Sequence, residues 1–239
     1  MISVRKAGFT IIEVMLFLGI SGLLFAGIIF GTGSSINVQR YRDSVNSLQS
    51  VLQQQFSDVT NVVNDSSSVT CGGASNPYRG QTICEVLGKF ITYSGGNSLS
   101  IQTVIGDPVR PEDNTSDLTI FKQYNFTLTA PPVTYDIEWG AQINDKNNSP
   151  MKFSILMLRS PLSGVVRTFM DVTTDSIPGP NIPSSLINPA ALNTTKAELC
   201  VDSNGLTTNK QIEILINAGA SNSAAIEMIG DAGAGYVCH

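Results

Sequence analysis

The chain begins with its strongest hydrophobic pattern, an apolar tract from Phe9 to Gly31 that holds a single charged residue, Glu13. As a helix this tract would be about 35 Å long at about 1.5 Å per residue, which matches a bilayer core of about 30 Å. A charged side chain at bilayer depth costs about 2.5–3.5 kcal/mol on insertion scales, so an acid in such a tract is a functional residue by default. The pattern predicts a membrane-spanning helix with a functional carboxylate near its start.

A second pattern continues the helix beyond the membrane. From Val38 to Val63, apolar residues recur at steps of three and four, the spacing of one helical face. We expect one helix from Phe9 to about Val63, loosened by the glycines of residues 31–35 where the membrane ends. The inward stripe of its second half contains Val38, Tyr41, Val45, Leu48, Leu52, Phe56, Val59 and Val63.

After residue 88 the pattern changes to short β-branched and aromatic runs bounded by Gly, Pro, Asn or Asp, which are typical of strands. We therefore expect an α+β fold, in which an antiparallel sheet or a two-sheet sandwich packs on the amphipathic half of the helix. Asn204-Gly205 predicts a turn between the last two runs. The strands are expected at Phe90–Tyr93, Leu99–Ile105, Leu118–Phe121, Tyr124–Leu128, Val133–Trp139, Met151–Leu158, Val165–Val172, Glu198–Asp202 and Ile212–Ile216.

Two stretches lack such runs and predict loops. Residues 64–76 are rich in Ser, Asn and Gly, and residues 177–193 hold four prolines among serines and asparagines. Long loops on a rigid scaffold often carry binding sites, although an inert connector is the simpler interpretation of the proline-rich stretch.

Charge places the two ends of the apolar tract on opposite sides of the membrane. Arg5 and Lys6 precede the tract and few basic residues follow it closely, which predicts a cytoplasmic start and an extracytoplasmic body. The formal net charge is −5. Basic residues gather nowhere after Arg42, so the nucleic-acid surfaces that depend on phosphate neutralisation by Lys and Arg are not expected.

The four cysteines agree with an exported body, because an even number in an oxidising compartment predicts disulfides. Three pairings are possible, and we favour the local one, Cys71–Cys84 and Cys200–Cys238. The first would close a loop of about 14 residues, worth about 3 kcal/mol in the chain-entropy model. A zinc site would need close C-x2-C or Cys/His spacing, which the sequence lacks.

The sequence predicts neither an enzyme nor a cofactor. Its one histidine is the final residue, His239, and it has no phosphate-binding loop, zinc-protease motif or nucleophile elbow. Asp202-Ser203-Asn204-Gly205 is similar to part of a calcium loop, but the other ligands are missing and a hairpin turn explains it better. Asp171, Asp175 and Asp231 have no spacing that supports a metal site.

The segment Gly8-Phe9-Thr10-Ile11-Ile12-Glu13 closely resembles the class III signal of type IV pilins and pseudopilins. The resemblance implies that a prepilin peptidase cuts between Gly8 and Phe9 and methylates the new amine. It also implies that Glu13 pairs with a neighbouring copy's terminal amine during filament assembly. Positions 9 and 13 lie one helical turn apart on the same face. The mature chain would carry a charge of −7, since the leader removes two basic residues.

Two simpler interpretations of the N-terminus fit less well. A secretory signal peptide has a shorter apolar region, followed by a cleavage site of small residues. An ordinary membrane anchor leaves Glu13 without a purpose. The absence of a proline before Pro77 favours a minor pilin or a pseudopilin over a major pilin. The strand–turn–strand around Asn204 resembles the carboxy-terminal hairpin of H-type pseudopilins and fimbrial T-type minor pilins.

The resemblance divides the chain into a leader (1–8), a transmembrane or filament-core half-helix (9–31), an amphipathic half-helix (32–63) and an extracytoplasmic β-rich domain (64–239). The expected function is that of a structural subunit of a type IV pilus or a type II secretion-like filament. Its expected partners are other pilin or pseudopilin subunits, the prepilin peptidase, the inner-membrane assembly platform and, before assembly, the membrane. A filament-borne binding module for adhesion or DNA uptake is the alternative, and a membrane-anchored enzyme is remote.

Overall fold

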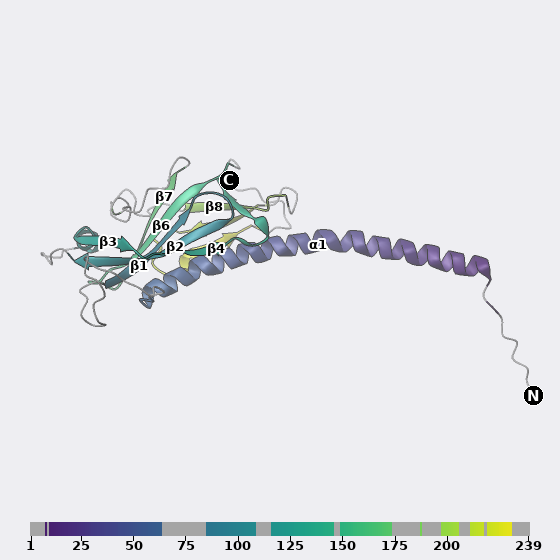
Figure 1. Ribbon diagram of the computed structural model, residues 1–239, viewed down its shortest axis with the longest axis horizontal. Coiled ribbons are helices and arrows are strands. Elements are labelled where there is room, and N and C mark those ends of the chain that lie inside the picture. Colours follow the sequence, from purple (N-terminus) through teal and green to yellow (C-terminus); the bar gives the residue numbers. More distant parts are fainter. Residues whose placement is uncertain are drawn as a thin grey trace, which may run out of the picture.

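The computed structural model describes residues 8, 10–63, 85–108, 116–145, 149–173, 187, 197–205, 211–217 and 219–230. Its most prominent element is one long helix, α1 (Ile11–Thr60), whose second half lies against a β-rich domain while its first half extends away from it (Figure 1). The described chain is therefore α+β, with a long N-terminal helix packed against antiparallel sheets, as the sequence predicts at this level.

The helix α1 begins and ends slightly inside the predicted limits of Phe9 and Val63. The Thr10 side chain accepts a hydrogen bond from the Glu13 backbone N–H and caps the first turn. At the other end the Asn61 N–H donates to the Ser57 carbonyl. The helix continues without a break through residues 31–35, where the sequence analysis expects it to be loosened. There the Thr32 hydroxyl donates a hydrogen bond to the Ile28 carbonyl of the preceding helical turn, at 3.0 Å.

The strands form two antiparallel sheets, so of the two predicted arrangements the one with two sheets is observed. Sheet A has the order β3-β2-β1-β6-β7, with β4 also paired to β2, and sheet B has the order β10-β9-β8-β5. Sheet A consists of β1 (Glu85–Tyr93), β2 (Ser98–Pro108), β3 (Tyr124–Leu128), β4 (Val133–Asp136), β6 (Lys152–Arg159) and β7 (Val166–Thr173). Sheet B consists of β5 (Gln142–Asn144), β8 (Ala197–Asp202), β9 (Gln211–Ile216) and β10 (Ile226–Ile229).

Some of the predicted strands are wrong or incomplete. Leu118–Phe121 belongs to a short helix, α2 (Asp117–Phe121), which Ser116 caps by accepting the Thr119 N–H. The strand predicted at Val133–Trp139 stops at Asp136 and is followed by a 3₁₀ turn, η1 (Glu138–Gly140). A second 3₁₀ turn, η2 (Ser223–Ala225), precedes β10. The expected turn at Asn204-Gly205 is confirmed, since both residues have positive φ and form a turn that begins two residues after β8 ends.

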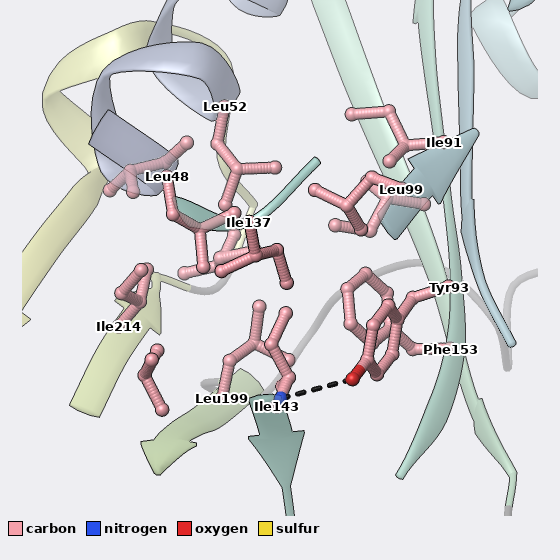
Figure 2. Close-up of a cluster of buried hydrophobic side chains, with 14 of the residues drawn as sticks. Leu48, Leu52, Ile91, Tyr93, Leu99, Ile137, Ile143, Phe153, Leu199 and Ile214 are labelled. Carbon is pink, nitrogen blue, oxygen red and sulfur yellow. Dashed lines mark hydrogen bonds between the residues drawn. The ribbon is translucent and has the colours of Figure 1, made fainter. Parts of the chain in front are cut away.

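The main core lies where α1, sheet A and sheet B meet. Leu48 and Leu52 project from the helix into the space between the sheets (Figure 2). Every predicted stripe residue from Tyr41 to Val59 is buried, whereas Val38 is half-buried and Val63 is exposed. The other labelled side chains are Ile91, Tyr93, Leu99 and Phe153 from sheet A, Ile143, Leu199 and Ile214 from sheet B, and Ile137, which follows β4.

A second core covers the opposite face of sheet A. Its members include Phe90 of β1 and Phe169 of β7, together with Phe121 of α2, whose ring meets that of Phe169 edge-on at 6.2 Å. Ile187 also belongs to this cluster and is buried. It is the one described residue of the predicted proline-rich loop, so the rest of that prediction, and that of the loop at 64–76, lie outside the described residues.

Candidate assembly helix and its junction with the β domain

The first half of α1 presents apolar side chains in every direction and packs against nothing else that the structure describes. Within its most apolar window no residue is buried, and the helix is long and apolar enough to cross a membrane. Side chains such as Ile12, Leu23 and Phe30 are more than three-quarters exposed. A helix that is apolar on all sides needs an apolar environment, so this half requires lipid or other helices around it.

Glu13 lies in the first turn of this exposed half. Its backbone N–H bonds to Thr10, at 3.1 Å to the carbonyl and 3.3 Å to the hydroxyl oxygen, while its carboxylate bonds to no group among the described residues. An acid in the first turn also interacts favourably with the helix dipole. Gly8 has open space around it. Phe9 lies outside the described residues, so the predicted proximity of its amine to Glu13 stays a prediction.

Tyr41 fixes the point where the helix enters the β domain. Its buried hydroxyl donates to the Val201 carbonyl and accepts the Ile212 N–H at 2.7 Å. Val201 and Ile212 face each other on β8 and β9, so one hydroxyl links the helix to two strands. Burial raises the pKa of Tyr41 above its usual range, the Ile212 N–H opposes this, and the nearby Asp202 adds to the rise. The phenol therefore stays protonated and can keep donating.

Further polar contacts hold the next turns of α1 to the domain. The Ser44 hydroxyl donates to the Glu138 carbonyl at 2.9 Å, and the Tyr135 hydroxyl bonds Ser47 at the same distance. Gln49 and Gln53, one turn apart, both donate to the Ile226 carbonyl, at 3.2 and 3.1 Å. These bonds join the helix to residues far along the chain, so the amphipathic half is an integral part of the β domain.

Beside this junction lies a pair that the sequence analysis missed, Arg40 and Trp139. The guanidinium carbon of Arg40 lies 4.7 Å from the centre of the Trp139 ring, a cation–π contact. Trp139 is the one tryptophan of the chain, and 51% of its surface is exposed. The pair is 99 positions apart in sequence and no local pattern joins the two residues. The presence of a single tryptophan was the one sequence signal that could have indicated a functional position here.

Of the four predicted disulfide cysteines, the structure describes Cys200 alone. It is disulfide-bonded and buried in β8. Cys71, Cys84 and Cys238 lie outside the described residues, so the predicted pairing stays a prediction.

The acidic residues considered for calcium are only partly described. Among the residues that the structure describes, no three His, Cys, Asp or Glu side chains form a possible metal group. Asp202 instead accepts the Asn204 N–H at 2.6 Å, as in an ordinary turn. Asp171 lies on β7, and Asp175 and Asp231 fall outside the described residues.

Comparison of the chain with protein-family models, with curated proteins and with solved structures gives no match. What the described residues define is therefore a structural class: an α+β protein that carries one N-terminal helix able, by length and composition, to cross a membrane.

Proposed function

We propose that this chain is a structural subunit, a minor pilin or pseudopilin, of a type IV pilus or a type II secretion-like filament. In this proposal a prepilin peptidase cleaves after Gly8, and the mature chain enters the filament through α1. One observation carries it: a single unbroken helix combines an exposed apolar half bearing Glu13 with a half that is built into a folded domain. This is what a subunit needs if it is to move from a bilayer into a helical filament core.

The apolar half of α1 supports the proposal because its exposed side chains must be shielded from water. In the membrane, lipid surrounds these side chains. Outside the membrane, exposed apolar surface of this size must be buried against another apolar surface, and the helices of neighbouring copies would provide it. Assembly then replaces lipid with protein, and the β domain remains in water.

The role proposed for Glu13 follows from the cost of burying a charge. Among packed helices a carboxylate is tolerated when it is paired and hydrogen-bonded. Cleavage after Gly8 would create an amine at Phe9, one turn from position 13. We propose that Glu13 of one copy pairs with the Phe9 amine of a neighbour, and that this pairing sets the axial step between subunits.

The subunit would begin as a single-pass protein of the cytoplasmic membrane with its β domain outside, where an oxidising compartment suits the Cys200 disulfide. Its partners would be the peptidase, the assembly platform and other subunits. The lack of a proline within the apolar tract is the reason for proposing a minor subunit.

The cleavage step is tested by intact mass and N-terminal sequencing of the protein made in a host with a prepilin peptidase. We expect a mature chain that starts at a methylated Phe9. A chain that still starts at Met1 in that host would contradict the proposal.

The assembly step is tested by Glu13→Gln, which removes the charge at nearly constant size, with Glu13→Asp as the control that keeps the charge. We expect Glu13→Gln to be cleaved and inserted but excluded from filaments, because the neighbour's amine loses its partner, while Glu13→Asp assembles in part. Incorporation of Glu13→Gln at the wild-type level would refute the pairing.

A further inference from the structure

The pair of Arg40 and Trp139 lies at the level where α1 leaves the β domain. Tyr41, the next residue of the helix, is the first that is fully buried in the domain, whereas Arg40 itself is exposed. Trp139 lies in η1, whose Glu138 carbonyl is tied to Ser44 one turn further along the helix. The pair therefore marks the edge of the domain that faces the apolar half of α1.

The spacing of charges along the helix sets the depth of this edge. Arg40 is the first charged residue after Glu13, 27 positions later in a helix that has no break. At about 1.5 Å per residue this separation is about 40 Å. A bilayer measures about 40–45 Å when the headgroup layers are included. With Glu13 at the level of the inner headgroups, this separation places Arg40 and Trp139 in the opposite headgroup layer.

We propose that Arg40 and Trp139 form a phospholipid headgroup-binding surface that seats the β domain on the extracytoplasmic leaflet before assembly. This rests on the proposed membrane insertion of α1. The Arg40 guanidinium is suited to a lipid phosphate because it forms paired hydrogen bonds to its oxygens. The Trp139 ring belongs at the same level, since tryptophan is enriched at the boundary between headgroups and hydrocarbon.

The local backbone holds this surface ready. Trp139 has φ of 57° and Gly140 has φ of 72°, so two consecutive residues are in the left-handed region. A bulky residue adopts this conformation only where its surroundings enforce it, and such residues cluster at functional sites. Here the strain turns an aromatic ring outward over a cation, although burying it would have been the more favourable use of its area.

The positive charge of this surface is local, and this identifies its ligand. Arg42 is also exposed, but Asp43 beside it and Glu138 beside Trp139 are exposed acidic residues, so Arg40 does not belong to a broad cationic patch. The binding group is therefore the phosphate that every phospholipid carries, and an excess of anionic lipid is not required. Vesicles of zwitterionic phosphatidylcholine are the appropriate probe.

The test uses the natural fluorescence of Trp139, the sole tryptophan. The full chain is reconstituted in phosphatidylcholine vesicles whose lipids carry bromine, a contact quencher, either near the headgroup or near the end of the acyl chain. We expect blue-shifted emission and stronger quenching by the shallow bromines than by the deep ones. Water-like emission that neither lipid quenches would overturn the proposal.

A matched control moves the probe to the other end of the domain. In the double variant Trp139→Phe/Leu162→Trp, the tryptophan lies in the β6–β7 turn at a position that is 58% exposed, and it should remain unquenched. In Arg40→Gln the quenching of Trp139 should fall, because the ring and the lipid both lose the guanidinium. Unchanged quenching in Arg40→Gln would overturn the part assigned to Arg40.

Other outcomes separate this proposal from its rivals. A spectral shift that appears only as the protein-to-lipid ratio rises would overturn it in favour of contact between copies of the chain. Removal of the protein from vesicles by alkaline washing would contradict the membrane span, on which both proposals depend. Wild-type filament incorporation of Glu13→Gln would contradict the assembly role alone and leave the quenching result valid.

Discussion

Two buried tyrosine hydroxyls form hydrogen bonds to backbone groups in the core of this protein. Tyr41 joins α1 to sheet B. Tyr93 donates to the Gly96 carbonyl at 2.6 Å and accepts the Ile143 N–H at 3.1 Å, which joins sheet A to sheet B (Figure 2). Each phenol lets an aromatic ring fill the core while its oxygen satisfies backbone groups that would otherwise be buried without partners.

Removal of the Tyr41 hydroxyl should be costly. Tyr41→Phe leaves the Ile212 N–H and the Val201 carbonyl buried without this partner, and we expect a loss of about 1–3 kcal/mol in the free energy of unfolding. Urea unfolding of the β domain in the detergent-solubilised chain measures it. Tyr135→Phe is the control, since its hydroxyl bonds the partly exposed Ser47 and should cost less. Equal losses in the two variants would contradict this account.

Asp117 should make stability depend on pH. Burial pushes the pKa of Asp117 up, but hydrogen bonds from Ser160, Ser163 and Arg167, together with the Arg167 charge, hold it below its usual value. The resulting stabilisation is present above the unfolded-state pKa of about 3.9 and is lost as pH falls through the lower folded-state value.

Asp117→Asn tests this linkage. At neutral pH we expect the variant to be less stable by about 1 kcal/mol, a small value because the 3.1 Å contact with Arg167 is partly exposed to solvent. Below pH 4 the difference between variant and wild type should shrink, since the wild-type carboxyl becomes protonated. Unfolding free energies measured across this range decide it, and a difference that does not change with pH would argue against it.

At the scale of elements, the long helix was the most predictable part. Its stripe from Tyr41 to Val59 repeats at one period over five turns and is buried as expected, because a long periodic signal averages out local exceptions. Its continuity through Gly31 and Gly33 was also expected, although a loosening was predicted there. Glycine weakens a helix by about 1 kcal/mol at most per residue, a cost that the cooperativity of a 50-residue helix outweighs.

The short elements were less predictable. Leu118–Phe121 has the composition of a strand, but Ser116 caps a single helical turn there and Phe121 packs against β7 instead of extending a sheet. The strands β5 and β10 were missed because they span only three and four residues, too few for a clear alternating pattern. Their strand character comes from pairing with β8 and β9, which lie far from β5 in sequence. The Arg40–Trp139 contact was likewise missed because its two residues are distant in sequence.

The two halves of α1 should respond differently to the same substitution. Leu52→Ala creates a cavity between the two sheets, and we expect it to lower the free energy of unfolding by about 2–5 kcal/mol. Leu24→Ala removes the same atoms from the exposed half and should leave the unfolding of the β domain unchanged. Denaturant melts of both variants in the same detergent make the comparison. A similar loss in both would show that the halves are not independent.

For the whole molecule, the disulfide at Cys200 is the covalent feature whose partner matters most. We predict Cys238, which would tie β8 to the end of the chain and close a loop worth about 4 kcal/mol in the chain-entropy model. Mass analysis of peptides from non-reducing digestion identifies the partner. A linked peptide that joins Cys200 to Cys71 or Cys84 would refute the local pairing, and the stability lost on reduction provides the second measurement.

The contact of Gln49 and Gln53 with Ile226 has a consequence for synthesis of the protein. These partners are separated by 177 and 173 positions, so the ribosome makes the helix early and the strand that closes over it nearly last. Contacts between such distant segments slow folding, and uncovered apolar side chains promote aggregation in the meantime. Part of the hydrophobic stripe therefore stays uncovered until the late strands of sheet B have been made, and the domain becomes complete only when β10 has emerged.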